Sequence, residues 1–210
     1  MKPRTADKIE HKEFEYLVER KYRNYKYVLY MFIAGLGLMY LTLTLMYVLY
    51  RFEYHLPSVR LTAMFIFNNM VLLLSIVTLY LTQHFFSTSN YYQYKTCLLM
   101  VSFLGLLFLA GQIIAVIKQL NLDVVNGYYT SYYLFLISII HALQVFMSML
   151  FWSIFSWKSW KQLNHYAISL VYFTDPVMRL QLNLFSIFWY SSGLFWMIVY
   201  VFFLAYSVSI

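Results

Sequence analysis

The chain has 210 residues, of which 62% are hydrophobic and 11% are charged. A soluble domain of this size needs a polar surface that these residues cannot supply, so the composition excludes an ordinary soluble fold. The formal net charge of +7 would suggest a nucleic-acid partner in a soluble protein. Here the charges lie beside long apolar segments, so membrane topology explains them better and no nucleic acid is expected.

Stretches that lack Asp, Glu, Lys and Arg mark the candidate membrane spans, because a charge at the bilayer centre is costly. About 20 apolar residues are needed to cross the hydrocarbon. This criterion predicts an all-α membrane protein, a bundle of five transmembrane helices near residues 27–50, 61–81, 97–117, 132–157 and 184–208. Ser87–Asn90 is expected to turn the chain between the second and third spans. Pro3, Pro57 and Pro176 are expected to fall outside the helices.

The positive charges predict the orientation of the bundle. Placing the N-terminus in the cytoplasm and the C-terminus in the periplasm puts 12 of the 15 Lys and Arg residues inside, and only Arg51, Arg60 and Lys118 outside. Residues 1–26 then form a charged cytoplasmic segment and residues 27–210 form the membrane domain. This segment lacks the features of a cleavable signal or transit peptide, which favours a bacterial inner membrane.

A charged helix over Asp7–Lys26 is expected to lead into the first span. It is interpreted either as a solvated extension or as a docking element for a partner subunit.

Few polar side chains lie within the predicted spans, and each is expected to face another helix because lipid offers no hydrogen-bond partner. They are Asn68, Asn69, Gln112, His141 and Gln144. In the fourth span Ser138 and Ala142 stand four residues apart, which lets another backbone approach closely. Together with His141 and Gln144 they form a small, polar strip that we expect a protein partner to cover.

His141 is the one titratable side chain deep in a predicted span, and it offers at most one axial ligand to a haem. A zinc or copper site needs three or four ligands, and the only cysteine is Cys97. Ser192-Gly193 lacks the preceding glycine of a Gly-x-Ser-Gly pattern for a serine hydrolase. No catalytic, cofactor-binding or metal-binding residue is therefore expected in this chain.

Several stretches of the spans carry recognisable residue patterns in a fixed order. Pro57 precedes the second span, which contains Phe67-Asn-Asn-Met-Val-Leu-Leu-Leu-Ser75, and the third span contains Leu104-Gly-Leu-Leu-Phe-Leu-Ala-Gly-Gln112. The fourth contains Ser138-Ile-Ile-His141-Ala-Leu-Gln144-Val145, and Trp189 and Trp196 stand seven apart in the last. In order, spacing and helix count these stretches resemble subunit III of the haem-copper oxidases, in its five-helix bacterial form, over roughly residues 27–208.

The resemblance implies a non-catalytic subunit of a respiratory terminal oxidase that packs against catalytic subunit I, with haem and copper in the partner subunits. It also implies bound phospholipid in a cleft between helices, and it leaves membership of a respiratory supercomplex open. The positions carried over as packing or lipid-cleft residues are Gln112, His141, Gln144, Trp189 and Trp196.

The chain departs from the family pattern at four positions. The family's intramembrane glutamate falls at Ala115, its second fourth-helix histidine at Gln144, and its last-helix histidine and aspartate at Tyr190 and Gly193. A structural role is therefore expected, without the proton-uptake role attributed to that glutamate. Two other hypotheses remain open: a small multi-span transporter or channel, and a membrane enzyme or haem carrier centred on His141.

Overall fold

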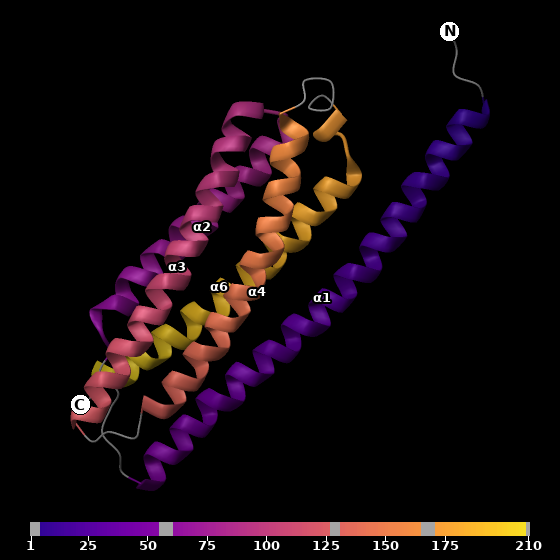
Figure 1. Ribbon diagram of the computed structural model, residues 1–210. Coiled ribbons are helices and arrows are strands. Elements are labelled where there is room, and N and C mark those ends of the chain that lie inside the picture. Colours follow the sequence, from indigo (N-terminus) through magenta and orange to yellow (C-terminus); the bar gives the residue numbers. More distant parts are fainter. Residues whose placement is uncertain (1–4, 55–60, 127–130, 165–170, 209–210) are drawn as a thin grey trace.

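The computed structural model describes residues 5–54, 61–126, 131–164 and 171–208 (Figure 1). Its helices are α1 (Thr5–Tyr54), α2 (Ala63–Ser87), α3 (Tyr91–Asn126), α4 (Ser131–Leu163) and α6 (Pro176–Val208). Over these residues the protein is all-helical, as predicted. Its five helices long and apolar enough to span a membrane cover Tyr22–Tyr54, Ala63–Ser87, Tyr91–Asn121, Tyr132–Leu163 and Pro176–Ala205.

Every helix is longer than the predicted span, and α6 starts well before the predicted residue. The expectation that the last helix begins near residue 184 and that Pro176 lies outside it is wrong, because Pro176 opens α6. The Asp175 carboxylate accepts a hydrogen bond from the Val177 N–H (2.8 Å), and proline at a first helical position leaves no N–H unsatisfied. Pro3 and Pro57 lie outside the described residues, as does Arg60.

The predicted turn between the second and third spans is confirmed. Helix α2 ends at Ser87, and Ser89 takes the left-handed conformation with φ of 55°. The Asn90 side-chain oxygen accepts a hydrogen bond from the Gln93 N–H (3.3 Å), which caps the start of α3. The short turn makes α2 and α3 antiparallel neighbours.

Helix α1 joins the charged segment to the first span without interruption. At 50 residues it is about 75 Å long, far more than the hydrocarbon thickness requires. Figure 1 shows α1 diverging from α4 and α6 toward its N-terminal end. It packs against α6 and α4, whereas α2, α3, α4 and α6 form a closer bundle in which α3 lies between α2 and α4.

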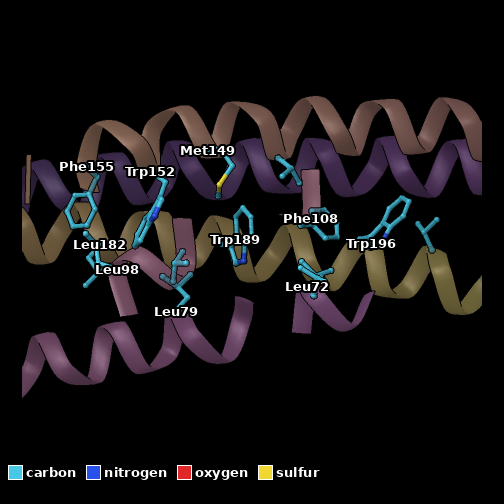
Figure 2. Packing of buried hydrophobic residues seen from close by; sticks show 14 of the residues in the cluster. Leu72, Leu79, Leu98, Phe108, Met149, Trp152, Phe155, Leu182, Trp189 and Trp196 are labelled. Atoms are coloured by element: carbon cyan, nitrogen blue, oxygen red, sulfur yellow. The ribbon is translucent and has the colours of Figure 1, made fainter. Parts of the chain in front are cut away.

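Buried aromatic side chains follow the long axis of this bundle. Trp152, Trp189 and Trp196 lie one after another between the helices in Figure 2, and each is at most 1% exposed. The indole N–H of Trp152 donates to the Ser102 hydroxyl (2.9 Å), which ties α4 to α3. Such packing and hydrogen bonding hold helices together in lipid, where the hydrophobic effect between helices is absent.

A chain of hydroxyl groups closes the end of the bundle where α4 leads back to α6. The Tyr94 and Tyr172 hydroxyls lie 2.8 Å apart, and Tyr172 donates to Ser159 (2.7 Å). Burial raises the pKa of Tyr172, so its hydroxyl stays protonated and available as a donor. Nearby, the Lys95 ammonium lies 3.8 Å from the centre of the Trp160 ring.

Candidate functional site

The polar side chains expected to face other helices do so. Asn68, Asn69, Gln112, His141 and Gln144 are all buried in the bundle, whereas many large apolar side chains of the same helices are exposed. A polar group in lipid must find a partner inside the protein. Four of them, Asn68, Gln112, His141 and Gln144, make the interior polar contacts of the candidate site.

The contact between α2 and α3 is built around an amide pair. The side-chain N–H of Asn68 donates to the side-chain oxygen of Gln112 (2.8 Å), and both residues are fully buried. Gly111 lies directly against this pair, and a Cβ at position 111 would overlap the Asn68 side-chain oxygen. The glycine thus allows the two helices to approach closely enough for the amides to meet.

His141 lies in an aromatic and hydroxyl environment between α4 and α6. Its ring stacks on Trp196 with ring centres 4.4 Å apart and an interplanar angle of 9°, and Phe108 packs edge-on. The Ser192 hydroxyl lies 3.4 Å from Nε2 of His141. Every one of these neighbours is uncharged, so the geometry holds the imidazole as a packing and hydrogen-bonding group.

Helix α6 also meets α2 through three side-chain hydrogen bonds. The Trp189 indole N–H donates to the Ser75 hydroxyl (3.1 Å). Farther along, the Tyr190 hydroxyl donates to the Gln83 side-chain oxygen (3.0 Å), and the Gln83 amide donates to Asn183 (3.3 Å). These contacts fix the rotation of α6 about its own axis.

The expectation that a partner protein covers the polar strip of the fourth helix is wrong. Ser138, His141 and Gln144 are buried within this chain, and Ala142 is partly buried. Other helices of this chain cover the strip instead: His141 contacts Trp196 of α6, Gln144 contacts Tyr40 of α1, and Ser138 lies beside residues of α2 and α3. The small and polar residues serve packing within the bundle.

A mostly apolar cavity of about 800 Å³ lies between α1, α4 and α6. Three side chains of α1 line it (Leu29, Phe32 and Leu36), and the rest of its wall belongs to α4 and α6. Its few polar lining residues are Gln144, Ser148, Lys158 and Gln181. The Tyr40 hydroxyl donates to the Gln144 side-chain oxygen (2.8 Å) at the wall of this cavity.

Of the five residues singled out from the sequence, Gln144 borders the cavity. Gln112, His141, Trp189 and Trp196 are packed in the bundle interior. Sequence reasoning missed Tyr40, one of 22 tyrosines and without a distinguishing pattern around it. It also read Lys158 only as a topology signal and Ser192 only as part of an incomplete hydrolase pattern.

Among the described residues, no group of three or more His, Cys, Asp or Glu side chains could hold a metal ion. Among the described residues, the arrangement offers neutral hydrogen bonding, aromatic packing and a mostly apolar cavity that Lys158 borders.

Comparisons with known proteins do not assign this chain to a family. No protein-family model matches the chain, and no curated protein matches it.

Proposed function

We propose that this protein is a non-catalytic accessory subunit of a respiratory haem-copper terminal oxidase, of the subunit III type. It packs against the catalytic subunit I, which together with other partner subunits supplies haem and copper. Its N-terminus lies in the cytoplasm of a bacterium and its C-terminus in the periplasm. Phospholipid bound between its helices completes the packing.

The observation that carries the proposal is the pairing of the stretches that resemble the family. Asn68 of the second span bonds to Gln112 of the third. Ser75 bonds to Trp189 of the last span, and His141 of the fourth stacks on Trp196. Residues quoted from separate stretches thus form one interior, which is the arrangement expected if the ordered pattern reflects a common architecture.

The departures from the family pattern support a structural role. Ala115, where the family has a glutamate, is buried among apolar side chains. A Cβ at Gly193, where the family has an aspartate, would lie 2.9 Å from the Ile76 side chain. Neither place offers a titratable group, so these positions serve packing.

The test is a pull-down of the tagged chain from its native membranes in mild detergent, followed by a reduced-minus-oxidised visible spectrum of the eluate. The proposal expects haem bands and a large co-purifying multi-span subunit. His141→Ala is expected to leave the haem bands in place, because haem belongs to the partner. An unrelated multi-span protein carrying the same tag is the control.

A colourless, solitary protein in several gentle detergents would contradict the oxidase assignment. Haem lost from the complex with His141→Ala while the partner subunit stays bound would contradict the non-catalytic role.

A further inference from the structure

A second, much smaller cavity lies where the end of α3 meets the start of α4. Asn126 ends α3 and Ser131 begins α4, and Gln119 and Ser138 each stand seven residues inward from these ends. Both side chains are therefore about 10 Å from the helix ends, at a rise of about 1.5 Å per residue. Figure 1 shows the two helix ends at the same end of the bundle. The apolar segment of α3 ends at Asn121, so the cavity lies close to the membrane surface and to bulk water.

The Ser138 hydroxyl differs from most serine hydroxyls of α4. Ser148, Ser153 and Ser159 each donate to the backbone carbonyl four residues earlier, at 2.9, 2.7 and 2.8 Å. Ser138 is 0% exposed, yet its oxygen has no hydrogen-bond partner among the described residues. Ser156 shares this lack, but it is only partly buried. A buried hydroxyl without a partner is costly, which indicates that Ser138 bonds to something outside the chain.

The cavity places Gln119 of α3 opposite this hydroxyl. The other lining residues are apolar: Phe65, Val116, Leu120, Leu134 and Phe135. Ser138, Gln119, Phe65 and Leu134 are each at most 4% exposed, so this part of the wall is closed to lipid. The Gln119 carboxamide has two donor hydrogens and an oxygen that accepts two hydrogen bonds. It can therefore bond to a molecule in the cavity in addition to its contacts within the chain.

The size and the charge of the cavity select its occupant. The space that the centre of a water molecule can occupy there is about 10 Å³. This volume is at the lower bound of the roughly 10–15 Å³ that one water molecule needs. A buried water also needs at least two polar partners, and Ser138 and Gln119 supply them. None of the charged side chains that the structure describes lines this cavity, which favours a neutral molecule over an ion.

We propose that one ordered water molecule binds in this cavity and joins α3 to α4. It accepts a hydrogen bond from the Ser138 hydroxyl and donates one to the Gln119 side-chain oxygen. The direct hydrogen bond between Trp152 and Ser102 joins the same two helices about 20 Å farther along α4. The water is its counterpart near the membrane surface. This site goes beyond the proposed function and does not depend on it.

The test is solution NMR of the full chain in lipid nanodiscs, with deuterated protein that carries labelled Leu and Val methyl groups. Magnetisation transfer is measured from the water resonance to each methyl group. The wild type is expected to show cross peaks to Leu134, Val116 and Leu120, with the sign that a bound, slowly exchanging water gives. Leu79 and Leu98 are 0% exposed and line neither described cavity, so their methyl groups are expected to show none.

Two variants each remove one proposed partner of the water. Ser138→Ala and Gln119→Leu are each expected to weaken the cross peaks by about fivefold, as for the loss of one net hydrogen bond. Gln119→Leu keeps the Ser138 hydroxyl, so it distinguishes a bound water from exchange of the hydroxyl proton itself. The matched controls are Ser153→Ala and Gln162→Leu on α4, which do not line this cavity and are expected to leave the cross peaks unchanged.

A wild type without water cross peaks to Leu134, Val116 and Leu120 would overturn the proposal, and this outcome needs no variant. Cross peaks of full strength in Gln119→Leu would also overturn it, because they would come from the Ser138 hydroxyl. Equally strong cross peaks to Leu79 and Leu98 would contradict a single site, because water would then penetrate the whole interior. Since no partner subunit is involved, these results are independent of the oxidase pull-down.

Discussion

At the scale of single residues, the interior of this protein depends on neutral polar pairs. Asn68 and Gln112 are fully buried and hydrogen-bonded to each other. Replacing either residue with alanine removes this hydrogen bond and leaves the amide of the other residue without that partner. In lipid the cost is moderated because a partly unfolded helix also finds other partners. The pair is therefore expected to contribute a modest but measurable coupling.

A double-mutant cycle measures this coupling. Asn68→Ala, Gln112→Ala and the double variant are unfolded in mixed micelles with increasing SDS. The coupling free energy is expected to be about 0.5–2 kcal/mol, as for interhelical hydrogen bonds in membranes. A coupling near zero would mean that the contact between the two amides adds nothing to stability.

At the scale of elements, close approach between helices depends on particular glycines. Gly111 of α3 lies against the Asn68 amide, whereas Gly35 of α1 has no atom within 4 Å of the place where a Cβ would stand. The two glycines thus differ in the space around them, although both lie within helices that can span a membrane.

Gly111→Ala is expected to push the Asn68 amide away from Gln112 and to destabilise the bundle by about 1–3 kcal/mol. Gly35→Ala is the matched control. It is expected to be neutral or stabilising by up to about 1 kcal/mol, because alanine favours a helix more than glycine does. If Gly111→Ala and Gly35→Ala reduced stability equally in the same SDS titration, packing at Gly111 would not limit the approach of α2 and α3.

At the scale of the whole molecule, the uneven distribution of Lys and Arg predicts the orientation in the membrane. The chain segment after α1 is expected in the periplasm and the turn after α2 in the cytoplasm. Alkaline phosphatase fused after Pro57 is therefore expected to be active, and the same enzyme fused after Ser89 inactive. Green fluorescent protein fused at the same two positions should give the opposite pattern. Activity of the phosphatase only after Ser89 would reverse the proposed topology.

For the described residues, the sequence by itself determined how many helices are long and apolar enough to span a membrane, the turn before Asn90 and the inward position of the polar residues. Charge and hydrogen bonding in lipid carry penalties that do not depend on the details of packing. A long uncharged run must therefore be a helix, and a buried amide such as Gln112 must face protein. The exact helix ends were less predictable, because capping by Asp175 extends α6 into a polar segment.

Only the tertiary structure decided which polar groups meet, that the Ser138 strip faces inward, and that Lys158 borders a cavity. These features depend on how each helix is rotated and tilted. A helix in a soluble protein reveals its buried face by its hydrophobic periodicity, but a membrane helix is apolar on the lipid side as well. The sequence pattern therefore did not show that His141 faces α6 or that Gln144 faces α1. The packing of the helices decided both.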